Sequence, residues 1–428
     1  MRIYNLNLDV FGGIGAYLDA RDILNLRFTC RFLRGVADHV LIPNKLNDLQ
    51  RKVLYNTSIS PIQKLRQIPL TDDNWSTCTF HPTQLVHTHS SIPVLNTHNH
   101  LLILASRSAV FVWDRCYSPW RYTRFVISNH SSASMDITGL VVVECVGDSV
   151  SLIASHFSGL VQRVILNLHS KKSSQTAIYC GSSRTSSAIS SSIRTPNLTS
   201  LTGTSNVVIS AAQMGQLRLL SPNAPWIEHP PINVETNRLW GVDYNSYNGS
   251  LSASHNYTPS TLSAVSLFHL RESNIQSTGS LKTPPHISSF TATNGSSTNG
   301  VLASPDIIIT GFYDSGVRVY DCRCGYAPVK QYQDALDPQP VYSVDVGGAY
   351  DSLICAGSAL YSRLRIIDAR MHSDRAHHVY AAESGDRSSP VYQLQTDHSH
   401  CFLATESNVY DLDFSSASPN HRFPTVTV

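Results

Sequence analysis

Charge is scarce in this 428-residue chain, and neither sign dominates. Asp, Glu, Lys and Arg make up only 14% of the residues, and 32 Lys and Arg against 30 Asp and Glu leave a formal net charge of +2 at pH 7. A surface with so little excess positive charge does not attract nucleic acid or an acidic membrane strongly. We therefore expect protein partners, with no nucleic acid and no membrane among them.

Long apolar runs are also missing. The chain has no stretch of about 18 uncharged apolar residues that would span a bilayer. Asp9 and Asp19 interrupt the apolar residues that follow the first methionine, which argues against a signal peptide. The nine cysteines are scattered without C-x-x-C spacing, so we interpret them as reduced thiols. These absences predict a protein of the cytoplasm, the nucleus or both.

Catalytic and cofactor-binding motifs are absent as well. The sequence has no glycine-rich phosphate loop, no G-x-S-x-G elbow and no H-E-x-x-H pair. An i, i+2 histidine pair on a strand places two imidazoles on one face, as a metal site needs, but no pair here has a third ligand at an evident spacing. We expect no catalytic residues, no metal and no cofactor, in a protein that is not an enzyme. The close pairs are His87 and His89, His98 and His100, His377 and His378, and His398 and His400.

What the sequence does contain is an internal repeat, from about residue 100 to the end. Each copy has a short apolar run that ends in small residues, a polar turn, and an alternating segment that often closes with an acidic residue. The small residues that mark the copies recur every 42 to 57 residues, close to the length of a propeller blade. The seven copies span 101–115, 151–166, 207–221, 251–270, 307–323, 353–370 and 401–414, and their markers are Ala105, Ala154, Ala211, Ala253, Thr310, Ala356 and Ala404.

The pattern within one copy explains the fold that it predicts. A strand covered on both faces must be apolar nearly throughout, whereas residues 317–321 alternate because successive side chains point to opposite faces of a sheet. A single four-stranded sheet cannot bury its own face, so the seven copies must close into a ring. We predict a mostly β fold, a seven-bladed β-propeller over 69–428, whose last blade takes a strand from the extended segment 75–98.

Three copies end in similar motifs, VFVWD, VYD and IID, and Asp314 precedes a Ser-Gly turn. These motifs resemble the WD-repeat signature, which implies a WD-repeat-type propeller. In that family the signature residues pack strands and cap turns, so we assign them no function. A propeller hydrolase with carboxylates converging on a central channel stays open as another class. The Trp position holds Trp113, Tyr320 and Ile367, and the acidic position holds Asp114, Asp321 and Asp368.

Four arginines recur at the second position of the alternating strands. Arginine suits phosphate recognition, but these strand positions favour packing and salt bridges within the blades, and we expect that structural role. The four are Arg163, Arg218, Arg318 and Arg365.

Residues 1–46 differ in kind from the repeats, because their apolar residues fall at helical spacing. Residues 23–34 alternate apolar side chains with arginines, which fits a short helix with one buried stripe that Asp19 or Asp22 can cap. A second helical stretch, broken at Pro61, predicts a linker helix over 47–68. So small a module buries little surface, and we expect a partner to cover its apolar side. The alternative is a helical cap that packs on the propeller and binds nothing.

The run YLDARDILNLR at 17–27, followed by CRFL at 30–33, is similar to the F-box, the segment by which substrate receptors dock on the Skp adaptor of SCF-type cullin ligases. With the repeats, the chain resembles the F-box/WD-repeat receptors, and the dactylin-like members most of all. The resemblance implies the substrate-recognition subunit of a cullin-RING ubiquitin ligase, which binds the Skp adaptor through its helices and a substrate protein through its propeller. A WD-repeat scaffold that joins no ligase is the alternative. The implied adaptor-binding residues are Leu6, Val10, Phe11, Ile14, Leu18, Ile23 and Leu24.

Overall fold

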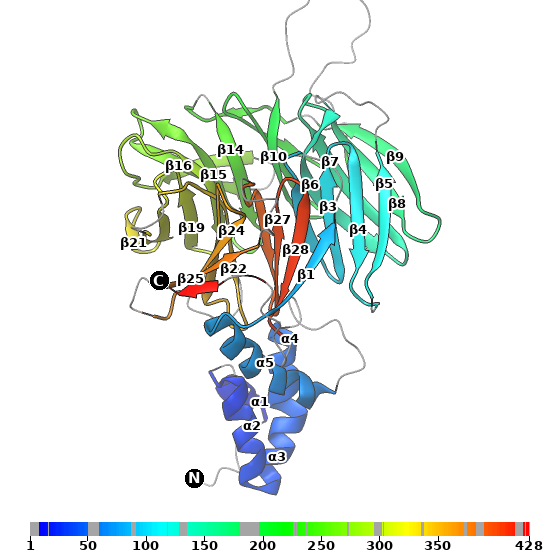
Figure 1. Cartoon of the computed structure of the whole chain (residues 1–428), viewed down its shortest axis with the longest axis vertical. Coiled ribbons are helices and arrows are strands. Elements are labelled where there is room, and N and C mark those ends of the chain that lie inside the picture. Colours follow the sequence, from blue (N-terminus) through cyan, green and yellow to red (C-terminus); the bar gives the residue numbers. More distant parts are fainter. Residues whose placement is uncertain are drawn as a thin grey trace, which may run out of the picture.

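The computed structural model folds the chain into a ring of seven β-sheets with a helical lobe on one face (Figure 1). The predicted mostly β, seven-bladed propeller is confirmed. Within the described residues, no helix is both long enough and apolar enough to cross a lipid bilayer. The structure describes residues 8–15, 17–49, 60–86, 91–117, 119–127, 135–179, 197–225, 227, 229–236, 238–271, 274–294, 302, 304–334, 338–371, 375–381, 389–415, 423 and 425–427.

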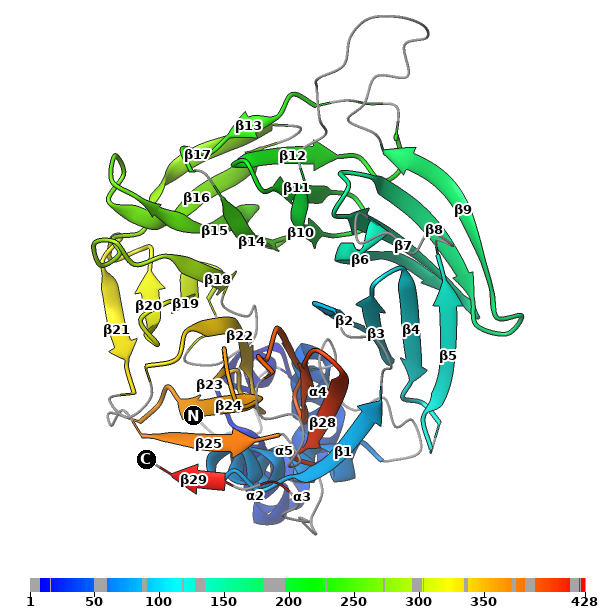
Figure 2. The same cartoon turned by 45° about the horizontal axis from the view of Figure 1, so that its top comes forward.

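Six blades are built from strands that follow one another in the chain, from the centre of the ring outward (Figure 2). The predicted repeats coincide with the second and third strands of every blade. The first three blades contain β2 (Val94–His98), β3 (Leu101–Ser106), β4 (Ala109–Asp114) and β5 (Arg121–Val126); β6 (Ile137–Val146), β7 (Ser149–His156), β8 (Val161–Asn167) and β9 (Lys172–Tyr179); and β10 (Leu198–Gly203), β11 (Val208–Ala212), β12 (Gln216–Leu220) and β13 (Ile232–Asn233). The next three contain β14 (Leu239–Asn245), β15 (Ser250–Thr258), β16 (Ser263–Arg271) and β17 (Asn274–Ser280); β18 (Ser289–Asn294), β19 (Ile307–Phe312), β20 (Val317–Asp321) and β21 (Pro328–Tyr332); and β22 (Val341–Gly347), β23 (Leu353–Ser358), β24 (Arg363–Asp368) and β25 (Ala376–Tyr380), to which β29 (Thr425–Thr427) adds a fifth strand.

The seventh blade closes the ring with strands from both ends of the propeller. It consists of β26 (Gln393–Thr396), β27 (His400–Ala404) and β28 (Asn408–Asp413), with β1 (His81–Val86) paired antiparallel to β28. The predicted contribution of segment 75–98 to the last blade is therefore confirmed for β1, while the end of that segment, Val94–His98, forms β2 of the first blade. The chain thus closes the ring by joining its N-terminal strand to its C-terminal strands in one sheet.

The cores between the blades explain why the second strands lack alternation. Every residue of β3 and of β23 is buried, because a neighbouring blade covers each face. Trp113 packs with Phe402 of the seventh blade, and Tyr320 packs with Leu267 of the fourth. The residues in the Trp position therefore join neighbouring blades.

The four recurring arginines make structural contacts within and between the blades. Arg318 is buried and pairs with Asp314 at 2.6 Å between Nη2 and Oδ2. Arg365 donates from Nη2 to a backbone carbonyl in the turn of the preceding blade, at 2.7 Å. The other two, Arg163 and Arg218, donate to side chains of their own blades. The expected structural role is confirmed.

The lobe contains α1 (Leu8–Gly15), α2 (Ala20–Thr29), α3 (Arg31–Val36), a π-helical turn η2 (Ala37–Leu41), α4 (Ile42–Leu49) and α5 (Pro61–Ser76). Asp19 caps α2 in a capping box: its carboxylate accepts from the Asp22 N–H, and the Asp22 carboxylate accepts from the Asp19 N–H. The predicted cap is confirmed.

Helix α5 differs from its prediction at both ends. Ser60 and Gln63 form a second capping box, which leaves Pro61 at the first helical position, where no N–H is needed. Pro61 therefore starts the helix instead of breaking it. The helix also runs through residue 69, where the sequence placed the start of the propeller, and the first strand begins at His81.

The end of α5 is fixed to the ring. The Trp75 ring stacks on Phe414 with centroids 3.6 Å apart, and its Nε1 donates to the His398 carbonyl at 3.0 Å. Arg370, after β24, pairs with Asp72 at 2.8 Å. These contacts join the lobe to the last two blades and set its orientation.

Candidate partner-binding surfaces

Two exposed apolar side chains lie on one face of α1. Val10 and Ile14 are 45% and 44% exposed, and a spacing of four residues places them on the same side of a helix. Tyr17 lies two residues beyond the last residue of the helix and is 92% exposed. A Cβ added at Gly13 would meet no atom within 4 Å, so the surface beside them is open. We call Val10, Ile14 and Tyr17 the α1 patch.

Two other predicted adaptor-binding residues lie inside the lobe. Phe11 is 7% exposed and packs edge-on against Phe32, with ring centroids 5.9 Å apart. Ile23 is fully buried in the same apolar cluster. Gly15 allows this packing, because a Cβ there would lie 2.6 Å from Leu41 Cδ2. Phe11 and Ile23 therefore hold α1 and α2 in place beneath the surface.

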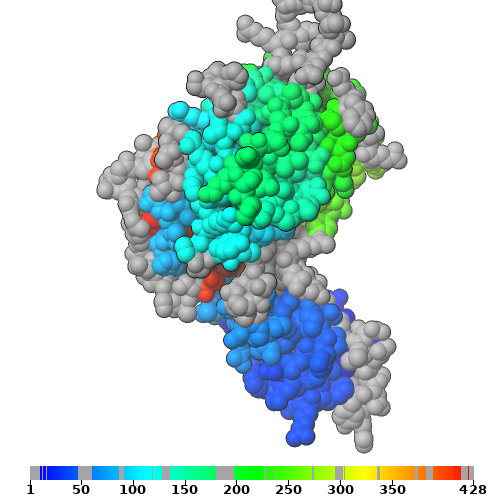
Figure 3. All heavy atoms as spheres, turned by 90° about the vertical axis from the view of Figure 1, so that its right-hand side faces the viewer, coloured from blue at the N-terminus to red at the C-terminus, as the bar shows by residue number. Residues whose placement is uncertain are grey.

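The remaining three predicted adaptor-binding residues are not part of the α1 patch. Leu18 and Leu24 are partly buried at the edge of that cluster, and Leu6 lies outside the described residues. The structure thus brings Val10 and Ile14 together on the surface, with Phe11 and Ile23 buried beneath them and Leu18 and Leu24 partly buried beside the core. The lobe projects from one face of the ring (Figures 1 and 3), so much of its surface is separate from the blades.

A second surface lies where the innermost strands of four neighbouring blades begin. In β14, β18 and β22 the register shifts around the second residue, which is Trp240, Phe290 or Tyr342. Such a bulge re-aims the side chain of the residue that leaves the ladder. Tyr392 directly precedes β26, the first strand of the next blade. We call these four residues the aromatic rim.

The aromatic rim is continuous from blade to blade. The ring centroids of Trp240 and Phe290 lie 4.8 Å apart, as do those of Phe290 and Tyr342, and both pairs meet edge to face. Tyr342 and Tyr392 follow at 6.2 Å. The Arg238 guanidinium lies 3.7 Å from the centroid of the Trp240 ring. All four rings are partly exposed.

The aromatic rim and the lobe lie on opposite faces of the ring. The turn after β26 contains His398, whose carbonyl accepts from Trp75 of α5, and the turn after β22 contains Ala349, which packs in the core of the lobe. The innermost strands therefore run from the rim toward the lobe. Figure 2 shows β14, β18 and β22 around the centre of the ring.

The chemistry of the rim suits a protein ligand. Flat aromatic faces offer large contact areas at low conformational cost, and a guanidinium stacked on an indole adds a fixed cation. Burial, followed by the neighbouring Glu406 and Tyr342, raises the pKa of Tyr392. Its hydroxyl therefore stays neutral near pH 7 and can donate a hydrogen bond.

The rim was not predicted from the sequence, although the sequence contains a signal for it. A short motif precedes each repeat by one strand, and its second residue is aromatic in LWGV (239–242), SFTA (289–292), VYSV (341–344) and VYQL (391–394). The same position holds Thr138 in ITGL and Thr199 in LTSL. The aromatic residues at this position of the motif therefore lie on one side of the ring.

No protein-family model matches the sequence, and no curated protein matches it. The propeller fold supports a protein-interaction or scaffold role.

Proposed function

We propose that this chain is the substrate-recognition subunit of an SCF-type cullin-RING ubiquitin ligase. In this proposal the lobe, which is similar to an F-box, binds the Skp adaptor, and the propeller binds target proteins. The observation that carries it is the α1 patch. Val10 and Ile14 stay exposed on a small lobe that has its own buried core, as expected of a surface that a partner covers.

The proposed role of the chain is to bring reactants together. The contacts of Trp75 and Arg370 fix the lobe relative to the ring, so an adaptor on one face and a target on the other would keep a set orientation. A tethered target lysine reacts as if it were highly concentrated near the ubiquitin carrier. The chain itself supplies no reacting group in this proposal.

Adaptor binding tests the proposal through the α1 patch. A full chain with Val10→Asp and Ile14→Asp should bind purified Skp adaptor at least about 100-fold more weakly than the wild type, because each apolar side chain buried at an interface contributes about 1.5–3 kcal/mol. Isothermal titration calorimetry measures both dissociation constants. Val10 and Ile14 are exposed, so the melting temperature should stay unchanged.

The matched control is Met214→Asp, at an exposed apolar residue of the propeller, which should bind the adaptor as the wild type does. A wild-type chain that does not bind the adaptor would overturn the proposal in favour of a scaffold that joins no ligase. Equal affinities of the wild type and the double variant would show that the adaptor does not use the α1 patch.

Target binding is assigned to the aromatic rim. In cells that lack the chain, the wild type should lower the abundance of a set of proteins, whereas a chain with Trp240→Ala and Tyr342→Ala should not, because both contact faces are lost. Quantitative mass spectrometry of the proteome measures the difference. The control is Tyr247→Ala. It removes an exposed aromatic ring from the turn between β14 and β15, at the opposite end of the blade that contains Trp240, and should act as the wild type. If the wild type and the rim variant lowered the abundance of the same proteins, the assignment of target binding to the rim would be contradicted.

A further inference from the structure

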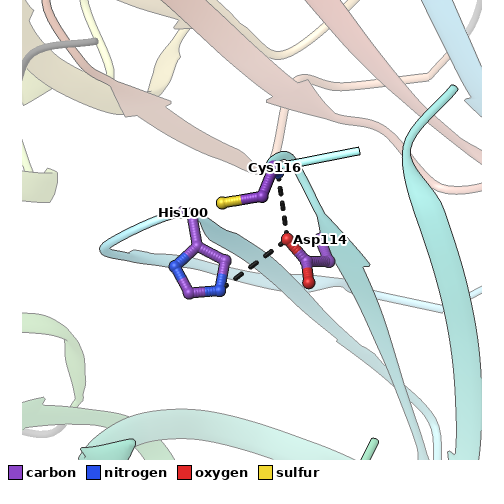
Figure 4. Close-up of side chains that lie close together, drawn as sticks. All are labelled: His100, Asp114 and Cys116. Carbon is purple, nitrogen blue, oxygen red and sulfur yellow. Dashed lines mark hydrogen bonds and ion pairs between the residues drawn. The ribbon is translucent and has the colours of Figure 1, made fainter. Parts of the chain in front are cut away.

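Three side chains with different metal-ligating atoms meet at the end of the first blade that faces the lobe side of the ring. The Nδ1 or Nε2 of His100, a carboxylate oxygen of Asp114 and the Sγ of Cys116 all lie within 4.8 Å of one another. The His100 Nε2 lies 3.7 Å from Asp114 Oδ1. Figure 4 shows the thiol above the imidazole and the carboxylate beside both.

The backbone fixes these groups before any ligand arrives. His100 lies in the turn between β2 and β3, and Asp114 ends β4. The Arg115 N–H donates to the His100 carbonyl at 3.0 Å, which ties the turn to the end of β4. The Arg115 side chain is held in turn, because its Nη1 pairs with Asp397 of the seventh blade at 2.6 Å. A site on such paired strands needs little reorganisation to bind an ion.

Comparison with the other blades shows what differs in the first one. The acidic residue that ends the third strand is Asp321 in the fifth blade and Asp368 in the sixth, and each pairs at 2.7 Å with an arginine two residues later. In the first blade, that position after Asp114 is Cys116. The first blade thus has a thiol where the other two blades have an arginine. His100 lies close to the carboxylate of Asp114 as well.

We propose that His100, Asp114 and Cys116 bind one divalent transition-metal ion of the zinc class, with water completing the tetrahedral coordination. Imidazole nitrogen, thiolate sulfur and carboxylate oxygen are the ligands that zinc takes in proteins, and the thiolate disfavours magnesium and calcium. When the sulfur–metal bond forms, the Cys116 thiol releases its proton to solvent. This inference is independent of the proposed ligase function.

The proposed site departs from the prediction of no metal, which was made because the pair His98 and His100 has no third ligand at an evident spacing in the sequence. Strand β2 ends at His98, so His100 lies in the turn and does not share a strand face with it. The further ligands come from the end of β4, across the sheet.

Cobalt(II) tests the site, because it occupies zinc sites and reports a thiolate ligand by a sulfur-to-cobalt charge-transfer absorption. The full chain, kept reduced, should develop this absorption on titration with Co²⁺ and lose it when Zn²⁺ is added. Cys116→Ser should abolish the absorption, and His100→Ala should weaken Zn²⁺ binding at least tenfold in competition with a chromophoric chelator. Zn²⁺ should raise the melting temperature of the wild type and not that of Cys116→Ser.

Cys324→Ser is the matched control, because Cys324 is an exposed thiol that follows Asp321 at the equivalent end of the fifth blade. It should leave both the absorption and the affinity unchanged. The proposal is overturned if the wild type gives no charge-transfer absorption, if Cys116→Ser keeps it, or if Cys324→Ser loses it.

Discussion

Replacing Trp75 with alanine is expected to lower the free energy of unfolding of the full chain by about 3–5 kcal/mol. Trp75 is fully buried where α5 meets the ring, and its loss removes the stack on Phe414 and leaves a cavity in the cluster that also holds Phe80. It also removes the donor to the His398 carbonyl. Urea unfolding followed by circular dichroism measures the change.

Two further variants separate the causes. Trp75→Phe keeps an aromatic ring over Phe414 but loses the hydrogen bond, so it should cost clearly less than the alanine variant. Leu70→Ala, on the exposed side of the same helix, should cost less than about 0.5 kcal/mol. A Trp75→Ala chain as stable as Leu70→Ala would show that the junction does not stabilise the protein.

This junction also limits which experiments on the lobe are informative. A chain that starts near residue 69 would cut through α5 and remove Leu65 and Ile68, which belong to the buried core of the lobe. If such a chain failed to bind the adaptor, the cause could be disruption of α5 and of the core of the lobe as well as removal of the α1 patch. Point substitutions at Val10 and Ile14 avoid this, because both side chains are exposed.

The sequence predicted the second and third strands of the blades because burial on both faces imposes a local pattern. Runs such as 101–106 are apolar throughout, and the small residues that end them leave room for the next blade. The innermost strands β6, β10, β14, β18 and β22 carry no comparable pattern, because a bulge shifts the register of each. Three residues of the aromatic rim, Trp240, Phe290 and Tyr342, lie at such bulges and were therefore missed.

The α1 patch was predicted only in part, for a different reason. Helical spacing identified the apolar residues of the lobe, but it does not tell which side of α1 meets the helices that follow. Phe11 turns inward and Val10 and Ile14 outward because η2 and α4, which follow later in the chain, pack against one side of α1. Such long-range packing decides exposure, and periodicity alone does not contain it.

Beside the junction, a charged network lies where the seventh blade meets the first. His400 Nδ1 pairs with Asp411 at 2.8 Å, and its Nε2 lies 3.9 Å from Asp413. Asp397 accepts from the His400 N–H at 2.7 Å and pairs with Arg115. Burial by itself would lower the pKa of His400, but the carboxylates of Asp411, Asp397 and Asp413 together raise it to about 9. His400 is therefore a cation at neutral pH.

The stability of the chain should therefore depend on pH through His400. The folded-state pKa of about 9 lies above the ordinary value of 6.5, so the contribution is full below pH 6.5 and is lost as the pH rises through 9. His400→Gln should cost roughly 3 kcal/mol at pH 6 and distinctly less at pH 9.5. Chemical unfolding of both chains at each pH measures the two differences, and a cost independent of pH would contradict the assignment.

His378 provides a control of opposite sign. Burial, and then the positive charge of Arg363, lowers its pKa to about 4, so its neutral form is favoured in the fold and the contribution is lost as the pH falls from 6.5 toward 4. The difference between the wild type and His378→Gln should therefore shrink on acidification, whereas that for His400→Gln should shrink on alkalinisation. The pKa values of two histidines of one propeller thus shift in opposite directions, because carboxylates surround the first, whereas burial and then the neighbouring arginines disfavour the charged form of the second.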